Sequence, residues 1–278
     1  MSAERLRRGL TAQTGTPVRA VGAVNALAAT AASGAGFDAL WVSSLEVSAA
    51  AGLADANVLG VRDLCDVVLA VGRTAHLPVV VDVDNAGGSA DSARRFAFDL
   101  ARAGAAALCL EDSAYPKCNS FSTHRTQGLA EASVVADQLR EMRRAGDDLV
   151  LIARTEALIA GAPFSEALDR ARYYAEHGAD AVLIHSRDPS GDEALRTVRE
   201  WAAPVPLVTV PTAFSHLGWQ ELGRAGFAMC IYANQLSRAA LAGMRAAAAE
   251  LAGTGSPGTV PLATVGELLA IGDPYARV

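Results

Sequence analysis

Two pairs of carboxylates close neighbouring apolar runs of the sequence. Asp82 and Asp84 end the run "PVVVDVD", and Glu111 and Asp112 end the run "LCLED". The i, i+2 spacing of Asp82 and Asp84 directs both side chains to one face of a strand. Three or four carboxylates on one rim repel each other unless a hard divalent cation neutralises them, and oxygen ligands favour Mg²⁺ or Mn²⁺ over zinc. We therefore expect a metal site at Asp82, Asp84 and Glu111; the alternative is that Asp84 and Asp112 cap helices or lie in loops.

A polar loop follows the second carboxylate pair. Residues 113–128 include Lys117, Asn119 and Ser120, contain one proline and show no clear apolar period. Such a segment is expected to lie over the rim of a sheet rather than in the core. We expect it to act as a lid, supplying groups that work only when water is excluded.

The second apolar run ends with Ser43 and Ser44, and Asp55 lies in the segment that follows. The two serines could donate hydrogen bonds to a substrate carboxylate, and Asp55 could reach the waters of the metal or a group in transfer. The alternative is that all three residues cap helices, a position in which serine and aspartate are favoured. Taken alone, these residues therefore predict no function.

Two later runs end in groups that could bind an anion. Arg154 and Glu156 close "VLIARTE" on one face of a strand, and a buried arginine needs an anion, which could be Glu156 or a ligand carboxylate or phosphoryl oxygen. His185 closes "VLIH", and Thr212 follows the next run. His185 is either a core histidine with satisfied hydrogen bonds or a ligand contact.

These groups need a scaffold that brings strand ends together. Short β-branched runs alternate with alanine- and leucine-rich helical stretches, the pattern of βα units around a parallel sheet. Glycines in "SGAGFDALWV", "ARAGAAALCL", "AEHGADAVLI" and "GRAGFAMCIY" are placed to end a helix in the left-handed conformation. We expect an α/β fold, a (β/α)₈ TIM-type barrel whose reacting groups lie at the C-terminal strand ends. The strands are predicted at 18–22, 39–43, 79–84, 106–111, 150–154, 181–185, 207–211 and 229–233.

Composition narrows the class of protein. The 278 residues carry a net charge of −6 with no lysine or arginine cluster, which argues against a nucleic-acid partner. No run reaches the roughly 20 apolar residues of a membrane helix, and the N-terminus lacks the apolar region of a signal peptide, so we expect a cytoplasmic protein. Four scattered cysteines predict neither disulfides nor structural zinc. We expect one domain over 1–278, with the barrel at about 18–252 and a linker and short helix at 253–278.

The sequence resembles the phosphoenolpyruvate mutase family of the isocitrate lyase superfamily over residues 18–238. The resemblance is carried by "AGFDALWVSSLEVSAAAGLADAN", "PVVVDVD", "LEDSAYPKCNS", "IARTEALIAG", "GADAVLIHSR", "VPT" and "YANQLSRAA". The family hallmark is Glu-Asp-Lys, five residues, then Asn-Ser. Here Glu111 and Asp112 precede Ser113 instead of lysine, and Asn119 and Ser120 follow at the family spacing.

The resemblance implies a (β/α)₈ barrel that exchanges its last helix between subunits of a homodimer or homotetramer. It implies an isomerase that converts phosphoenolpyruvate to phosphonopyruvate in phosphonate biosynthesis. Mg²⁺ would be held by Asp82, with Asp84 and Glu111 in the surrounding shell. The other implied roles are Asp55 beside the transferring phosphoryl group, Trp41 and Ser43 beside the substrate carboxylate, Arg154 on the substrate and its enolate, His185 on the phosphoryl group, and Lys117, Asn119 and Ser120 on the lid.

Three departures from the family pattern bear on the substrate. Ser113 replaces a lysine, residues 85–88 differ from the usual Thr, Gly-Tyr/Phe-Gly segment, and Val42 and Ser44 replace glycines. Phosphonopyruvate hydrolase is the nearest alternative, although its lid usually carries threonine at the position of Asn119.

Two further alternatives stand beside the mutase. A C–C lyase such as 2-methylisocitrate lyase would place its lid cysteine in a Lys-Lys/Arg-Cys-Gly-His motif. Cys118 directly follows Lys117, and no Gly-His follows it. The other alternative is a non-catalytic relative whose metal site has degraded.

Overall fold

Eight parallel strands close into a barrel in sequence order, and β8 pairs with β1. The computed structural model describes residues 2–12, 14–122, 127–146 and 148–273. The strands are β1 (Val18–Gly22), β2 (Ala39–Val42), β3 (Val79–Asp82), β4 (Ala107–Glu111), β5 (Val150–Thr155), β6 (Ala181–Ile184), β7 (Leu207–Thr209) and β8 (Phe227–Tyr232). This confirms the predicted (β/α)₈ barrel.

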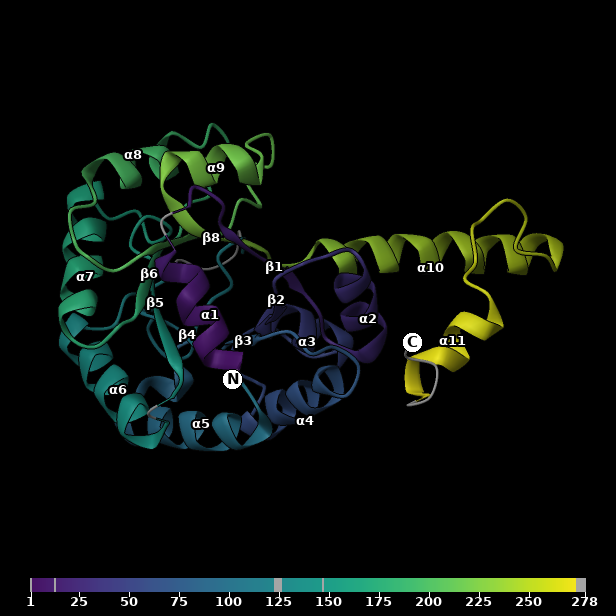
Figure 1. Cartoon of the computed structure of the whole chain (residues 1–278), viewed down its shortest axis with the longest axis horizontal. Coiled ribbons are helices and arrows are strands. Elements are labelled where there is room, and N and C mark those ends of the chain that lie inside the picture. The colour runs from purple at the N-terminus through teal and green to yellow at the C-terminus, as the bar shows by residue number, and fades with distance from the viewer. Residues whose placement is uncertain (1, 13, 123–126, 147, 274–278) are drawn as a thin grey trace.

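Most of the helices surround the barrel on its outer side, whereas the first helix lies across one end of it and the last two helices extend away (Figure 1). The helices are α1 (Ser2–Thr11), α2 (Ala26–Gly34), α3 (Ser44–Ala50), α4 (Val61–Gly72), the 3₁₀ turn η1 (Ala86–Gly88), α5 (Ala90–Ala103), α6 (Ala132–Ala145), α7 (Phe164–Glu176), α8 (Asp192–Glu200), α9 (Trp219–Ala225), α10 (Gln235–Thr254) and α11 (Val265–Gly272). The predicted glycines Gly36, Gly104, Gly178 and Gly226 all have positive φ. They turn the chain from a helix back to the next strand, as expected.

The strand predicted at 79–84 is too long, because it includes Asp84. β3 ends at Asp82, and Asp84 has a φ of 51° while Ala86 has a φ of 47°. Left-handed residues cannot continue a strand. The expectation that Asp82 and Asp84 share a face through strand alternation is therefore wrong. Asp84 comes beside Asp82 because the chain bends sharply after the strand.

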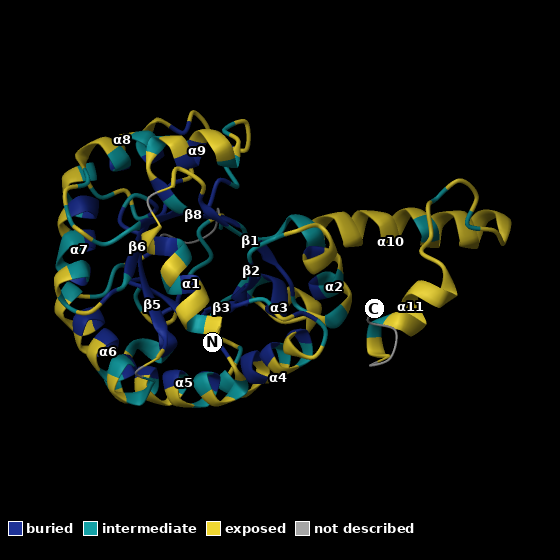
Figure 2. Cartoon of the chain, in the orientation of Figure 1, coloured by how far each residue is buried: buried dark blue, intermediate teal, exposed yellow. Residues whose placement is uncertain are grey.

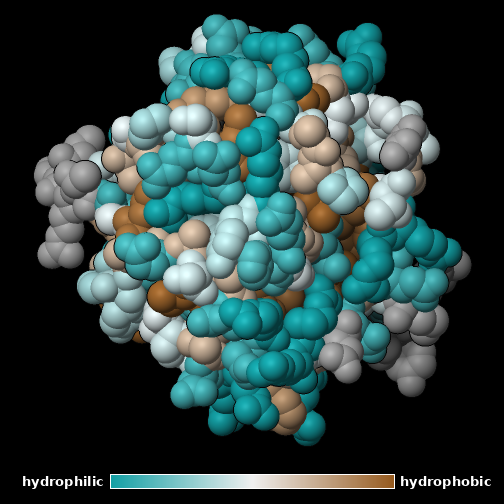
Figure 3. Space-filling model, turned by 90° about the vertical axis from the view of Figure 1, so that its left-hand side faces the viewer, coloured by the Kyte–Doolittle hydropathy of each residue, from teal (hydrophilic) through white to brown (hydrophobic). Residues whose placement is uncertain are grey.

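The core has two layers. Inside the barrel, small side chains at Ala20, Ala39 and Ala107 leave room for the indole of Trp41, which is 1% exposed. Leu6 and Leu10 of α1, with the residues around them, close the opposite end of the barrel. The second layer lies between the strands and the helices, and Figure 2 shows it as buried strands inside helices with exposed outer faces. The surface of the molecule that lies on the left in Figure 1 is mostly hydrophilic, with scattered hydrophobic patches (Figure 3).

The last two helices leave the barrel. Figure 1 shows α10 extending away from it and α11 turning back, where α11 contacts α2. Neither helix has a buried residue, and large apolar side chains are exposed on the two helices and at Leu262 between them: Leu241, Met244, Leu251, Val265, Leu268 and Leu269. In the described part of the chain, no helix is both long and apolar enough to cross a membrane.

A buried carboxyl lies where α10 begins. Glu46 of α3 is 2% exposed, and its Oε2 approaches Gly22 so closely that a Cβ there would lie 2.2 Å away. Burial raises the pKa of Glu46 to about 7, although the hydroxyl and backbone N–H of Ser237 in the first turn of α10 favour the charged form. The carboxyl is therefore half protonated near neutral pH.

Replacing Glu46 with glutamine tests this burial. Because the folded-state pKa lies above the ordinary value of 4.5, the contribution of Glu46 to stability is fully present below about pH 4.5 and is lost as pH rises past 7. Near pH 4.5, we expect E46Q and the wild type to have similar free energies of unfolding. At about pH 8.5, we expect the free energy of unfolding of E46Q to exceed that of the wild type by up to about 3 kcal/mol. Urea unfolding at both pH values measures the difference, and identical pH dependence in the two proteins would contradict it.

Candidate active site

Three carboxylates meet at the C-terminal ends of β3 and β4. One oxygen each of Asp82, Asp84 and Glu111 lies within 4.8 Å of the others, and all three residues are buried. Burial raises the pKa of Asp84 to about 6 although Lys117 opposes the shift, and it raises the pKa of Glu111 to about 8 although Arg154 opposes it. An oxygen-only set of crowded carboxylates fits a hard divalent cation such as Mg²⁺ or Mn²⁺.

The fourth carboxylate of the rim does not join this cluster. Asp112 is fully buried and accepts hydrogen bonds from Thr155 Oγ1 at 2.8 Å, the backbone N–H of Glu156 at 2.7 Å and the Tyr174 hydroxyl at 2.8 Å. It holds the end of β5 in place. Asp112 therefore neither caps a helix nor contributes to a four-carboxylate rim.

A single ammonium group neutralises much of the cluster. Lys117 Nζ lies 2.5 Å from Asp84 Oδ1, 2.7 Å from Asp55 Oδ1 and 3.1 Å from Ser44 Oγ. Burial alone would lower the pKa of Lys117, but Asp84 and the neighbouring carboxylates raise it above its ordinary value. Lys117 is also the only lysine in the sequence, a signal that sequence reasoning overlooked. The lid therefore places the ammonium charge of Lys117 among the carboxylates.

The lid also contacts Asp55. Asn119 Nδ2 donates to Asp55 Oδ2, while Asn119 Oδ1 accepts from the backbone N–H of Phe121 at 2.9 Å. Asp55 does not cap the next helix, because α4 is preceded by Gly60 and its first turn is closed by Asp63. The capping alternative for Asp55 is wrong, and its carboxylate lies between two lid side chains.

The serines after β2 have mixed roles. Ser43 caps α3, since its Oγ accepts from the backbone N–H of Glu46 at 3.4 Å, so the capping alternative holds for Ser43. Ser44 Oγ contacts both Lys117 and, at 3.4 Å, Asp82 Oδ2. Both serines line the same cavity as Trp41.

Arg154 joins the carboxylate cluster to the next strands. Its guanidinium lies 3.8 Å from Asp82 and 3.7 Å from Glu111, forms a closer ion pair with Glu156, and lies 2.8 Å from His185 Nδ1. Burial alone would raise the pKa of Glu156, but Arg154 and His185 lower it well below its ordinary value. Burial lowers the pKa of His185, so its imidazole is neutral at pH 7. Glu156 is thus the protein anion that pairs with the buried arginine.

Ser120 fastens the lid to this side of the rim. Its hydroxyl donates to Glu156 Oε2 at 2.8 Å and accepts from Arg154 Nη2 at 3.2 Å. Gln127 Nε2 also donates to Glu156 Oε2, at 3.3 Å. Residues 123–126 of the predicted lid lie outside the described residues.

The predicted site residues surround one small cavity of about 60 Å³. Asp84 lies behind Lys117 and does not line it. The predicted residues that do line it are Trp41, Ser43, Ser44, Asp55, Asp82, Glu111, Lys117, Asn119, Ser120, Arg154 and His185. Residues at or just after the ends of β3 to β6 form a charged wall, which Lys117 and Ser120 of the lid contact. Trp41, Ser43, Ser44 and Asp55 complete the lining from β2 and the segments after it.

Part of the cavity wall was not predicted. Asn234, directly after β8, lines the cavity, as does Thr212 after β7. Asn234 Oδ1, Thr212 Oγ1 and Trp41 Nε1 are buried and have no hydrogen-bond partner among the described residues. Buried polar atoms are nearly always paired, so these three neutral groups are available to a ligand or to water. The signal for Asn234 in the sequence is its position just after the eighth predicted strand, where reacting groups of such barrels lie.

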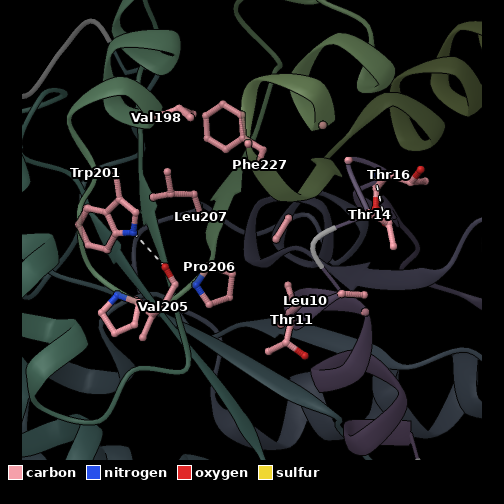
Figure 4. A pocket seen from close by; sticks show the side chains of 17 residues that line it. Leu10, Thr11, Thr14, Thr16, Val198, Trp201, Val205, Pro206, Leu207 and Phe227 are labelled. Atoms are coloured by element: carbon pink, nitrogen blue, oxygen red, sulfur yellow. Dashed lines mark hydrogen bonds between the residues drawn. The ribbon is translucent and has the colours of Figure 1, made fainter.

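A larger cavity lies at the opposite end of the barrel. Its volume is about 590 Å³, and its walls come from α1, the loop after it and the start of β7 and β8 (Figure 4). Leu10, Trp201 and Phe227 line it together with threonine, proline and glycine residues, and none of its lining residues is titratable. It lacks acid, base and cation, so the chemistry belongs to the smaller cavity.

Comparisons with known proteins agree with this geometry. The family model described as "Phosphoenolpyruvate phosphomutase" matches residues 6–252. The phosphoenolpyruvate phosphomutase of Streptomyces hygroscopicus is 39% identical over 81% of this chain and 72% of its own length. The crystal structure of phosphoenolpyruvate phosphomutase from Streptomyces platensis subsp. rosaceus superposes with a TM-score of 0.92, at 35% identity over 98% of this chain and 95% of its own.

Similarity is nearly as strong to an enzyme with a different reaction. The structure of phosphonopyruvate hydrolase in complex with oxalate and Mg²⁺ superposes with a TM-score of 0.89, at 34% identity over 98% of this chain and 94% of its own. Proteins that resemble this chain to the same degree thus include both a mutase and a hydrolase. The chain belongs to the phosphoenolpyruvate phosphomutase family.

Proposed function

We propose that this protein is a Mg²⁺-dependent phosphoenolpyruvate mutase. It would move the phosphoryl group of phosphoenolpyruvate from oxygen to C3, giving phosphonopyruvate, and would act in the cytoplasm in phosphonate biosynthesis. The observation that carries the proposal is the contact between Asn119 and Asp55. The lid amide donates to the carboxylate with Nδ2 and accepts from the Phe121 backbone with Oδ1, so both of its ends are used. The threonine usual in the hydrolases has a shorter side chain with one hydroxyl, so it could not make these two contacts through two separate atoms.

The size of the cavity supports a compact substrate. About 60 Å³ holds only a few water molecules, and Lys117, Asn119 and Ser120 all reach across it from the lid. A small cavity closed over by these lid side chains suits a compact acid such as a three-carbon acid. Exclusion of water also favours transfer of a phosphoryl group over its hydrolysis.

The residues of the charged wall suit a loose, metaphosphate-like transition state, which needs stabilisation of charge more than covalent chemistry. Asp82, Asp84 and Glu111 would hold Mg²⁺. Mg²⁺, when bound, supplies a Lewis acid for the oxygens of the enolate. Arg154, which stays charged, would donate hydrogen bonds to the same oxygens.

The remaining residues hold the two ends of the substrate. The neutral His185 would donate or accept one hydrogen bond at the phosphoryl group, and Asp55, held by Asn119, would keep that group in line during transfer. Trp41, Ser43 and Ser44 would orient the carboxylate. Positioning of this kind accounts for much of the rate enhancement in phosphoryl transfer.

Two coupled assays test the proposal and separate it from hydrolysis. Phosphonopyruvate and Mg²⁺ are incubated with the enzyme and lactate dehydrogenase. Hydrolysis releases pyruvate directly, whereas the mutase releases phosphoenolpyruvate, which becomes pyruvate only after pyruvate kinase and ADP are added. NADH oxidation that requires pyruvate kinase supports the proposal. Oxidation without it supports a phosphonopyruvate hydrolase.

We also propose that α10 is exchanged between subunits of a homodimer or homotetramer. Met244 and Leu241 on α10 are 63% and 45% exposed, more apolar surface than a helix in water usually leaves uncovered. We expect Met244→Arg to shift the protein to smaller species in sedimentation velocity, while the wild type stays oligomeric on dilution. A monomeric wild type would contradict the exchange.

A further inference from the structure

A chain of neutral side chains connects the carboxylate cluster to the lid. Ser113 Oγ donates to Glu111 Oε1 at 2.5 Å, and Asn85 Nδ2 donates to the Ser113 carbonyl at 3.2 Å. Asn57 Nδ2 donates to Asn85 Oδ1 at 3.1 Å, and Asn57 Oδ1 accepts from the backbone N–H of Lys117 at 2.6 Å. We call Ser113, Asn85 and Asn57 the relay. Each member contacts the next, from a predicted metal ligand at one end to the lid backbone at the other.

Two members of the relay are buried and the third, Asn57, is half-buried in an unusual backbone conformation. Ser113 is 1% exposed and Asn85 is 2% exposed. Asn57 has a φ of 58°, a left-handed conformation that asparagine tolerates better than most residues. Buried polar networks whose members are all paired hold one arrangement, because breaking any contact leaves a buried group unpaired. A displacement at one end of the relay therefore disturbs the other.

Two departures from the mutase pattern contact each other in the relay. Ser113 replaces the family lysine, and Asn85 begins the segment that differs after Asp84. A lysine at position 113 would put a charge beside Glu111, whereas the serine hydroxyl and the Asn85 amide put a neutral link there. The two departures, Ser113 and Asn85, are thus complementary, because each side chain supplies a hydrogen-bonding group that the other contacts.

The lid is held in two different ways at Lys117. Its ammonium pairs with Asp84 and Asp55, while its backbone N–H donates to Asn57. A divalent cation at the cluster would compete with the ammonium for the charge of Asp84. The contact with Asn57 is neutral and does not compete, so it can hold the lid over a loaded site.

We propose that Asn57, Asn85 and Ser113 are positioning residues that couple binding of a divalent cation at Asp82, Asp84 and Glu111 to closure of the lid. The proposal rests on the metal site of the proposed function but needs no phosphoryl chemistry.

The single lysine gives a direct probe of the lid. A lysine-specific endoproteinase can cleave only after Lys117, which is 5% exposed, so cleavage requires the lid to open. The rate of cleavage is measured against Mg²⁺ concentration in the full-length protein, with no substrate present. The thermal unfolding curve of the same samples shows whether the barrel itself has loosened.

Two variants interrupt the relay at opposite ends. Asn57→Gly keeps the left-handed backbone and removes the amide; we expect about tenfold faster cleavage without metal, and a weaker protection by Mg²⁺. Ser113→Ala should be cleaved at nearly the wild-type rate without metal but require about tenfold more Mg²⁺ for protection. Gln138→Leu is the matched control. Gln138 is a buried amide that donates to the Asn85 carbonyl at 2.7 Å but lies outside the relay, and Gly88 N–H also donates to that carbonyl.

The outcomes separate the coupling from the proposed function. Asn57→Gly and Ser113→Ala with the wild-type dependence on Mg²⁺ would overturn the coupling, as would a shift of equal size in Gln138→Leu. So would an active wild type that Mg²⁺ does not protect from cleavage. A wild type that Mg²⁺ protects through the relay, but that turns over neither phosphonopyruvate nor phosphoenolpyruvate, would leave the coupling in place and refute the proposed reaction.

Discussion

Replacing Asp82 with alanine is expected to lower turnover by at least about 10³-fold. Asp82 ends β3, is 5% exposed and lies in the cluster with Asp84 and Glu111, so its loss removes the central ligand of the predicted cation. The measurements are kcat at saturating substrate and Mg²⁺ binding by titration calorimetry. Turnover and Mg²⁺ binding should be lost together, because the carboxylate acts on the reaction through the cation that it holds.

The matched control is Asp137→Ala on the solvent side of α6, where the side chain is 55% exposed. It should keep wild-type turnover and Mg²⁺ affinity. Turnover of Asp82→Ala at ordinary Mg²⁺ concentration would contradict the assignment of the metal site.

Replacing Asn119 with alanine should lower kcat by about 10²-fold while leaving the thermal unfolding curve unchanged. The side chain of Asn119 contacts Asp55 and the lid backbone, and it lines the cavity rather than the core. Its loss frees Asp55 to move during transfer without creating a core cavity. The two measurements are kcat and melting temperature, and an unchanged rate would refute the role of the lid amide.

Asn119→Thr is the informative companion to that variant. Threonine is the residue usual in phosphonopyruvate hydrolase lids, but its single hydroxyl on a shorter side chain cannot make the contacts to Asp55 and the Phe121 N–H through two separate atoms. We expect the ratio of inorganic phosphate to phosphoenolpyruvate among the products to rise above that of the wild type. A ratio equal to that of the wild type would mean that the lid amide does not decide between transfer and hydrolysis.

The barrel could be predicted because its signals are local. Each βα unit combines a short apolar run with a glycine that ends the preceding helix, and the predicted strands differ from the observed ones by only a few residues at their ends. Asp82, Glu111, Arg154 and His185 could be selected because the fold places strand ends on one rim. The resemblance to a family then supplied the roles that spacing alone left open.

The remaining features depend on contacts that spacing does not encode. The sharp bend at Asp84 replaces the strand alternation that was expected, and Asp112 turns toward Thr155 instead of the cluster. Asn57 contacts residues 28 and 60 positions away through its amide. Such contacts arise from left-handed backbone and side-chain direction, which no periodicity reveals.

The most direct test of the proposed function is a phosphorus NMR time course with phosphonopyruvate and Mg²⁺ as the only additions. We expect the phosphonate signal to decline while a phosphoenolpyruvate signal grows, and we expect neither change with Asp82→Ala. A growing signal of inorganic phosphate, with no phosphoenolpyruvate at any time, would contradict the mutase and assign the hydrolase reaction. An unchanged spectrum would contradict both.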